Sequence, residues 1–287
     1  MIKKCDVLVL GATGMLGNTI LRYFHARSEF STAGTIRGFI PPAVFSGADY
    51  NIVSGVDVSN ADCLVELFST YRPTVVINCI GLVKQLSASE DPLNCMPINS
   101  LLPHRLAALC GTIGARLVHI STDCVFDGKK GMYLESDWPN ARDLYGRSKL
   151  LGEVSNLNAI TLRTSIIGHE MGVSHSLLEW FLSQDERAHG FRKAIFSGLP
   201  TVELARVIHD FVLPEPSLNG VYHVSSDPID KFSLLKLFAS EYSKNTDVIP
   251  NDELIIDRSL DSKKFRTTTG FMPNCWEEMV RLMREFG

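Results

Sequence analysis

The first 170 residues alternate short, β-branched apolar runs with segments of helical periodicity. The apolar runs lie at residues 5–11, 32–36, 50–58, 74–80, 116–122 and 159–167. Helical patterns fill the intervals at residues 15–27, 61–71, about 98–110 and around 145–149. Parallel strands need a crossover between them, and a helix of this length supplies one. We therefore predict an α/β fold, a Rossmann-type doubly wound parallel sheet with helices on both faces.

The first strand is followed by a glycine-rich turn, "VLVLGATGMLGNTI". Its spacing, G-x-x-G-x-x-G, differs from the usual dinucleotide fingerprint, and such a triplet also occurs in ordinary turns. The strand before it and the apolar helix after it favour a phosphate site, where glycines allow close backbone approach and the helix start attracts an anion. The residues predicted to bind a dinucleotide here are Gly11, Thr13, Gly14, Met15, Leu16 and Gly17.

The end of the second strand indicates which dinucleotide would bind. Sites that select NAD usually have a carboxylate there, which accepts from the ribose 2′-OH. This chain reads "TAGTIRGF" and offers Arg37 instead, a side chain suited to a 2′-phosphate. We predict NADP(H), with NAD(H) kept as an alternative and a solvated loop arginine as the simpler explanation. Asp57, with Val58 beside it, is placed to meet the adenine amine.

A tyrosine and a lysine stand four residues apart in "DLYGRSKLLGE", at Tyr145 and Lys149. On a helix they share a face, so the ammonium can lower the pKa of the phenol and make it an effective proton donor near neutrality. The pattern alone is common on solvated helices. Ser121 and Thr122 end the preceding strand, and either hydroxyl could hold a developing alkoxide. Three elements in this order predict hydride transfer to a ketone.

The composition excludes several other classes. With 28 Lys and Arg against 32 Asp and Glu the net charge is −4, and basic residues cluster only in pairs, so we expect no nucleic-acid or membrane-surface partner. The apolar run near the N-terminus is too short for a signal or a membrane span, which favours a cytoplasmic protein. Seven cysteines without a CxxC pair predict neither disulfides nor a metal site. His119 and the three tryptophans, Trp138 among them, are expected to be packed core residues.

Beyond residue 168 the rhythm breaks into shorter pieces. Helices are predicted at about 175–183, 201–213, 232–242 and 274–286, with a strand at 220–226 and, earlier in the chain, an inserted loop at 37–50. We predict a dinucleotide-binding Rossmann domain at residues 1–168. The remainder, 169–287, is predicted to be a smaller C-terminal α/β substrate-binding region from which the chain crosses back to the sheet.

The chain resembles the extended short-chain dehydrogenase/reductase family, and within it the dTDP-4-dehydrorhamnose reductase group. The resemblance covers nearly the whole chain. The segments that carry it are "GATGMLG", "STDCVFDG" at 121–128, "YGRSKLLGE" at 145–153, "LRTS" at 162–165 and the tail "RSLDSKKFRTTTGFMP" at 258–273. It implies NADPH-dependent reduction of the 4-keto group of a nucleotide-activated 6-deoxyhexose, for a surface polysaccharide precursor.

The same resemblance assigns roles to individual residues. Thr122 matches the catalytic hydroxyl, Tyr145 the proton donor, and Lys149 the residue that binds the nicotinamide ribose and lowers the pKa of the tyrosine. Further cofactor contacts would come from Cys79, Ile80, Gly81 and Ser121. The substrate contacts that it implies are Asn99, Asp123, Val125 and Phe126. Apart from the resemblance, Lys84 and Arg163 could meet the phosphates or hydroxyls of a sugar nucleotide, with a surface or structural ion pair as the other reading of each.

Other readings stay open at this point. Cys124 stands where the group usually has tyrosine, and Ile166 where it usually has an aromatic residue, so the reductase chemistry is better supported than rhamnose itself. A sugar-nucleotide epimerase would retain its dinucleotide, and some relatives are non-catalytic partners of other enzymes. We expect a monomer or homodimer.

Overall fold

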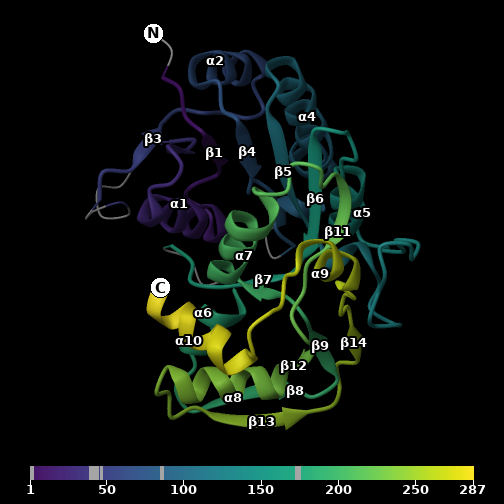
Figure 1. Cartoon of the computed structure of the whole chain (residues 1–287). Coiled ribbons are helices and arrows are strands. Elements are labelled where there is room, and N and C mark those ends of the chain that lie inside the picture. Colours follow the sequence, from purple (N-terminus) through teal and green to yellow (C-terminus); the bar gives the residue numbers. More distant parts are fainter. Residues whose placement is uncertain (1–2, 39–44, 46–47, 85–86, 172–175) are drawn as a thin grey trace. The chain divides into compact units, whose positions relative to one another are not determined.

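The computed structural model describes residues 3–38, 45, 48–84, 87–171 and 176–287. Its contacts divide the chain into two compact units, each built from three segments (Figure 1). The first unit comprises Met1–Ser121, Asp143–Leu162 and Pro216–Val221, and the second comprises Thr122–Arg142, Arg163–Glu215 and Tyr222–Gly287. The predicted division at residue 168 concerns cofactor binding and substrate binding, and it does not coincide with the limits of these compact units. It stays a prediction.

A seven-stranded sheet forms the centre of the first unit. Its order is β11-β6-β5-β4-β1-β2-β3, and the pairs between β3, β2, β1, β4 and β5 are parallel. The strands are β1 (Val7–Leu10), β2 (Thr32–Thr35), β3 (Asn51–Val53), β4 (Val75–Asn78), β5 (Arg116–Thr122), β6 (Ala159–Thr164) and β11 (Gly220–His223). The order 3-2-1-4-5-6 confirms the predicted Rossmann-type fold.

Helices cover both faces of this sheet. Their bounds are α1 (Met15–Arg27), α2 (Ala61–Tyr71), α3 (Pro92–Cys95), α4 (Leu102–Ile113) and α5 (Leu144–Leu151), with a 3₁₀ turn at Ser87–Glu90. Successive side chains of a strand lie on opposite faces of the sheet, so two neighbouring residues of β2 show what packs on each face. Ala33 packs in the cluster that contains α2 and α4, whereas Gly34 faces Leu21 of α1. The sheet is thus buried on both sides, as its apolar runs predict.

Helix ends follow the local sequence. Asn60 caps α2 by accepting from the N–H groups of Asp62 and Cys63, and α1 and α2 have the predicted bounds. The helix predicted at 98–110 is instead a π-helical segment, η2 (Met96–Leu101), followed by α4. Pro97 and Pro103 donate no N–H there, so the regular hydrogen-bond ladder is interrupted.

The second unit contains three small sheets. They are β10-β7, β12-β9-β14 and β13-β8, built from β7 (Ile166–Ile167), β8 (Arg187–Phe191), β9 (Ala194–Phe196), β10 (Leu199–Pro200), β12 (Ile229–Asp230), β13 (Asp247–Asn251) and β14 (Ile256–Asp257). Its helical segments are η3 (Asp123–Val125), α6 (Leu177–Leu182), α7 (Thr201–Val207), η4 (Ile208–Val212), α8 (Lys231–Glu241), α9 (Lys263–Thr269) and α10 (Trp276–Phe286).

Several predictions for this part need correction. The apolar run at 159–167 is two strands in different sheets, and the run at 50–58 is a strand only at Asn51–Val53. The helix predicted at 201–213 becomes α7 and the π-helical η4. The strand predicted at 220–226 is found as β11 (Gly220–His223). The other strands between residues 187 and 257 were not predicted, because each is short and none has a local signal for its partner. Parts of the loop predicted at 37–50, and residue 175 of the α6 prediction, lie outside the described residues.

Candidate functional site

The glycine turn joins β1 to α1 through close backbone packing. A Cβ added to Gly17 would lie 2.1 Å from the carbonyl oxygen of Gly11. Gly11 has φ +84°, and a Cβ there would lie 2.8 Å from Ile80 Cγ1. Only glycine meets both conditions without displacing backbone. The turn therefore fits the close approach that a pyrophosphate needs.

The first turn of α1 presents backbone N–H groups. Gly14 is the N-cap residue, and no side chain caps this helix end. The preceding strand end is tied down by Gly11 N, which donates to Thr35 Oγ1 at 3.3 Å. Thr13 and Gly14 are exposed, whereas the side chain of Leu16 is buried. The uncapped helix start and its dipole suit an anion, so the residues present fit a dinucleotide phosphate.

The turn lies at the switch point of the sheet. β1 pairs with β2 on one side and with β4 on the other, and Cys79 N donates to the carbonyl oxygen of Leu10. The carboxyl ends of β1 and β4 are therefore adjacent. In open α/β sheets, ligands bind outside the carboxyl ends of the strands at such a point.

Arg37 and Asp57, predicted to meet the adenosine end, are both exposed and electrostatically coupled. Hydrogen bonds from the hydroxyl and backbone N–H of Ser59 lower the pKa of Asp57, and the charge of Arg37 lowers it further. Val58, in contrast, is buried. The predicted phosphate-binding cation Arg37 thus lies close enough to the predicted adenine acceptor Asp57 for its charge to act on that carboxylate.

Behind the end of β4 lies a buried histidine. Asn78 Oδ1 accepts from Ile80 N at 3.1 Å, and Asn78 Nδ2 lies 3.1 Å from His119 Nδ1. The amide nitrogen Nδ2 of Asn78 can only donate, so His119 Nδ1 accepts and His119 Nε2 carries the proton. In the described part of the chain Nε2 has no partner. Burial, then the charge of Lys149, lowers the pKa of His119 well below its ordinary value. His119 is a core residue as predicted, but an incompletely satisfied one.

Asn99 lies in the π-helical segment η2 and connects two parts of the site. Its Oδ1 accepts from Leu82 N at 2.9 Å, and its Nδ2 donates to Leu82 O and Ser148 Oγ, each at 3.1 Å. The side chain is 1% exposed. Asn99, predicted to contact the substrate, therefore positions the loop after β4 against α5 in this structure.

The α5 helix begins at a charged cap. Asp143 accepts from Gly146 N at 2.9 Å and forms an ion pair with Lys84 at 3.0 Å. Both partners of the pair are partly exposed, with 47% of the Lys84 side chain accessible. Lys84 thus has the ion pair that the sequence left as its other reading, and its contact with a substrate stays a prediction.

Tyr145 and Lys149 lie one turn apart on α5, as predicted. Tyr145 is half-buried, and Lys149 is 6% exposed with its Nζ donating to the carbonyl oxygen of Ile120 at 2.8 Å. Burial lowers the pKa of Lys149 to about 8, although the charge of Glu153 opposes the shift. In an environment of low dielectric, a cation lowers the pKa of a nearby phenol more than it does in water.

The two candidate hydroxyls at the end of β5 have different partners. Ser121 Oγ donates to Glu153 Oε1 at 2.7 Å. Thr122 Oγ1 accepts from Cys124 N at 3.1 Å and lies 3.2 Å from Asp123 Oδ1. Ser121 belongs to the first unit with Tyr145 and Lys149, and Thr122 is the first residue of the second. Both hydroxyls thus have partners in this structure, and the substrate contact of Thr122 stays a prediction.

Three predicted substrate residues follow Thr122. Burial raises the pKa of Asp123. The charge of Arg258 and a hydrogen bond donated by the Thr122 hydroxyl oppose this rise. Val125 and Phe126 are fully buried, and the Phe126 ring stacks on Tyr133 with centroids 4.1 Å apart. Neither residue is exposed in this conformation, and the carbonyl oxygen of Phe126 already accepts from Arg258, so contact of Val125 or Phe126 with a sugar stays a prediction.

Arg163, another predicted substrate residue, belongs to the core of the second unit. It is 4% exposed, its Nη1 lies 3.3 Å from His223 Nε2, and its guanidinium lies 5.4 Å from the centre of the Phe126 ring. Burial, followed by the charge of Arg163, lowers the pKa of His223 to about 4. The structure therefore gives Arg163 the structural role that the sequence left open.

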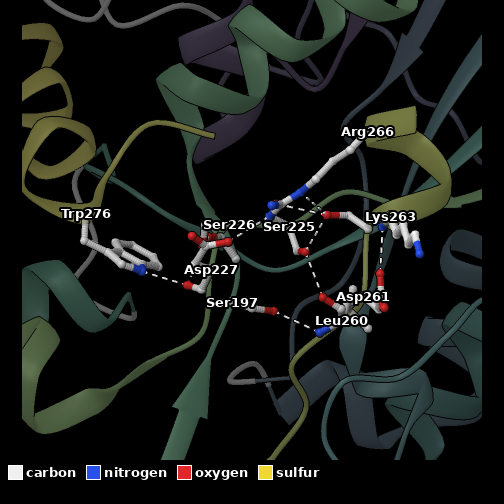
Figure 2. Close-up of polar contacts among 11 residues, drawn as sticks. Ser197, Ser225, Ser226, Asp227, Leu260, Asp261, Lys263, Arg266 and Trp276 are labelled. Atoms are coloured by element: carbon white, nitrogen blue, oxygen red, sulfur yellow. Dashed lines mark hydrogen bonds and ion pairs between the residues drawn. The ribbon is translucent and has the colours of Figure 1, made fainter. Parts of the chain in front are cut away.

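The tail motif is anchored by buried polar contacts, which Figure 2 shows. Ser225 Oγ donates to the carbonyl oxygen of Leu260 at 2.8 Å and contacts Ser262 Oγ at 2.9 Å. Arg266 donates to Ser262 Oγ, to the carbonyl oxygen of Ser225 and to Asp227. Apart from the local bond between Arg266 and Ser262, these bonds join residues 35 to 41 positions apart, so much of the motif holds the fold together.

Three further features of the described residues concern metal ligands, membrane-spanning helices and Trp138. No group of three or more His, Cys, Asp or Glu side chains in them could hold a metal ion. The helices among these residues include none with the length and apolar character to cross a membrane. Trp138, expected to be packed, is instead 87% exposed, so that expectation is wrong.

A comparison with known protein families decides the assignment. The family described as "RmlD substrate binding domain" matches residues 5–285. This chain belongs to that family. The glycine turn, the Tyr145–Lys149 helix and the tail motif all lie inside the matched range, and the fold matches the one that the resemblance implied.

Relatives of this RmlD-family chain have different names. It is 31% identical over 183 residues to the "probable low-salt glycan biosynthesis reductase Agl14" of Haloferax volcanii, covering 61% of this chain and 59% of that protein. It is 28% identical over 169 residues to the bovine (Bos taurus) "methionine adenosyltransferase 2 subunit beta", covering 58% and 48%. The matches thus span about half the length of these relatives.

A solved structure shares the fold. The dTDP-4-dehydrorhamnose reductase of Bacillus anthracis, crystallised with NADP, superposes with a TM-score of 0.77 at 23% identity, over 98% of this chain and 99% of that one. At this identity the likeness establishes the fold.

Sequence reasoning missed several residues that organise the site. Asp143, Ser148 and Glu153 have side-chain contacts that hold α5 in place. Glu153 lies in the quoted segment "YGRSKLLGE", four residues after Lys149, and this i, i+4 spacing was the signal available.

Proposed function

We propose that this chain is an NADPH-dependent reductase that acts on the 4-keto group of a nucleotide-activated 6-deoxyhexose, dTDP-4-dehydrorhamnose or a related sugar. The observation that carries the proposal lies within the first unit. A glycine turn at the switch point of a parallel sheet and a helix with Tyr145 beside buried Lys149 belong to one compact unit. Membership of the RmlD substrate binding domain family supports the substrate class.

In this proposal the nicotinamide cofactor supplies the hydride when it is bound. The residues of the chain do the remaining work. Tyr145 donates a proton to the oxygen of the reduced carbonyl, and the ammonium of Lys149 favours the phenolate that remains. The Thr122 hydroxyl would hold that oxygen, Cys79, Ile80 and Gly81 would contact the bound cofactor, and Asp123 would contact the sugar. Arg37 would accept the 2′-phosphate that distinguishes NADPH from NADH.

The test is a panel of nucleotide 4-keto sugars with dTDP, UDP or GDP carriers. NADPH consumption is followed by its absorbance, and the reduced sugar is identified by mass spectrometry. Substrate-dependent oxidation of NADPH by the purified protein supports the proposal. A protein that binds NADPH but oxidises it with none of the sugars contradicts it.

A second candidate is a non-catalytic, dinucleotide-binding regulatory subunit. The similarity to methionine adenosyltransferase 2 subunit beta favours it. Retention of Thr122, Tyr145 and Lys149 in this chain weighs against it. NADPH binding without turnover on the panel would support this reading.

A sugar-nucleotide epimerase on the same fold is the remaining alternative. Such an enzyme recycles its hydride and therefore keeps its dinucleotide. Stoichiometric dinucleotide in the protein after dialysis would favour an epimerase, and its loss would favour a reductase.

A further inference from the structure

Ile120 and Ser121, consecutive residues of β5, bond to Lys149 in α5 and to Glu153, which follows α5. The carbonyl oxygen of Ile120 accepts from Lys149 Nζ at 2.8 Å, and Ser121 Oγ donates to Glu153 Oε1 at 2.7 Å. All four residues belong to the first unit. Because Ile120 and Ser121 are consecutive in β5, these two contacts hold the Glu153 carboxylate close enough to Lys149 for its charge to act on the ammonium.

The backbone after α5 fixes this arrangement. Gly152 ends the helix, and Glu153 N donates to the carbonyl oxygen of Leu150 at 3.1 Å, so the turn continues past the last helical residue. A Cβ at Gly152 would lie 1.9 Å from the carbonyl oxygen of Asn99. The close packing against Asn99 leaves Glu153 little freedom to leave β5.

The ionisable groups that face Lys149 come from three elements. Cys79 follows β4, His119 lies in β5, and Glu153 follows α5, with Tyr145 one turn earlier on the helix itself. Burial raises the pKa of the Cys79 thiol, which therefore stays protonated, and lowers the pKa of His119, which stays neutral. Among these groups, Glu153 is the one that carries a negative charge at neutral pH.

A buried ammonium needs such a partner. Lys149 is 6% exposed, and its hydrogen bond to Ile120 satisfies one of its three N–H groups without neutralising the charge. An unpaired charge in this environment shifts towards its neutral form. A neutral lysine would neither favour the phenolate of Tyr145 nor donate three hydrogen bonds.

We propose that Glu153 is a positioning residue, clasped by Ser121, that keeps Lys149 in its ammonium form and so maintains the Tyr145–Lys149 pair at the alkaline end of its working range. The kinetic part of this inference rests on the proposed function. The charge of Lys149 can be measured without any turnover, so the two can fail separately.

The decisive variant is Glu153→Gln, because glutamine can still accept from Ser121 while the charge is removed. We expect the pKa of Lys149 to fall from about 8 by about one unit or more. A lysine is charged below its pKa, so the alkaline limb of the kcat/KM profile moves to lower pH by the same amount. At a pH near the wild-type value, activity falls by up to about tenfold.

The direct measurement is an NMR titration of the labelled lysine side chains, with the Lys149 signal assigned by its loss in Lys149→Met. Glu153→Asp retains the charge and should restore most of the wild-type pKa. Glu66→Gln removes an exposed carboxylate from α2 and should change nothing. An unchanged Lys149 pKa in Glu153→Gln overturns the proposal.

If Glu153→Gln does not fold, Ser121→Ala takes its place in the same titration. Loss of the clasp should lower the pKa of Lys149 by a smaller amount, and no change would again overturn the proposal. If the wild-type protein reduces no nucleotide sugar, the proposed function fails, yet the titration still decides the role of Glu153.

Discussion

The two units satisfy their buried polar groups in different ways. In the first unit, parallel backbone pairing runs through the sheet, and the candidate site depends on space and charge: Gly17 packs against Gly11, and Lys149 is buried beside Ile120. In the second unit, side chains such as Ser225 and Arg266 bond to segments far away in sequence (Figure 2). We therefore expect substitutions of the glycine turn and of the Tyr145–Lys149 pair to change ligand binding or turnover, and removal of the Ser225–Arg266 network to change mainly stability.

The largest expected effect is that of Tyr145→Phe. Loss of a general acid costs about 10²–10⁴-fold in rate, and phenylalanine leaves the helix and the glycine turn unchanged. We expect kcat to fall by this factor while NADPH affinity, measured by fluorescence titration, stays within a few fold. Normal turnover in this variant would remove the proposed acid from the mechanism.

Gly17→Ala tests the packing of the glycine turn. The new Cβ would lie 2.1 Å from the carbonyl oxygen of Gly11, so the turn must open. We expect a stability loss of about 1–3 kcal/mol by denaturant unfolding and NADPH binding at least about tenfold weaker.

The matched control for this variant is Gly111→Ala in α4. Its added Cβ would have its nearest contact 3.7 Å away, at Asn158 Nδ2, and alanine favours a helix. It should leave NADPH binding intact and stability equal or slightly higher. Equal losses in the two variants would show that the turn has no special role.

Arg266→Ala tests the polar network of the second unit. It removes the bonds from a charged donor to Ser225, Ser262 and Asp227, of which the first two are buried, so we expect a loss of about 2 kcal/mol in unfolding free energy. Arg281→Ala removes the exposed pair with Glu278 and should cost less than about 1 kcal/mol. Similar losses would show that burial of the network contributes nothing.

Lys149→Met reverses the usual sign of a site mutation. Because burial lowers the pKa of Lys149 from 10.5 to about 8, its charge destabilises the folded state, and we expect the variant to be inactive but about 1–2 kcal/mol more stable at pH 7. The folded chain releases this proton before the unfolded chain does. Wild-type stability should therefore rise relative to the variant between about pH 8 and pH 10.5.

The control for this prediction is Lys84→Met. Lys84 is about half exposed and paired with Asp143, so its removal should give no gain in stability. Denaturant unfolding measured across this pH window checks both variants. If the unfolding free energies of wild type and Lys149→Met change with pH in parallel, burial does not lower the pKa of Lys149.

The smallest effect is expected for Arg37→Gln, because Arg37 is exposed. Loss of one solvent-screened contact to a 2′-phosphate is worth about 1 kcal/mol, so the ratio of kcat/KM for NADPH to that for NADH should fall about fivefold. An unchanged ratio would mean that residues other than Arg37 determine the cofactor preference.

Local patterns determined much of the first unit. The bounds of α1 and α2 follow from their periodicity and from the Asn60 cap, and the strand-helix alternation was enough to predict the parallel sheet. The i, i+4 spacing of Tyr145 and Lys149 placed both on one helix. These features are readable because each depends on residues close together in the chain.

Tertiary structure alone decided the rest. The pairing of β13 with β8 joins Asp247 to Arg187, sixty residues away, and no local signal specifies such a partner. The adjacent hydroxyls Ser121 and Thr122 look alike in sequence, yet one is bonded to Glu153 and the other is not. The burial of Lys149 likewise depends on packing against β5. Long-range contacts set the partner, the solvation and hence the charge of each group, and those contacts exist only once the chain has folded.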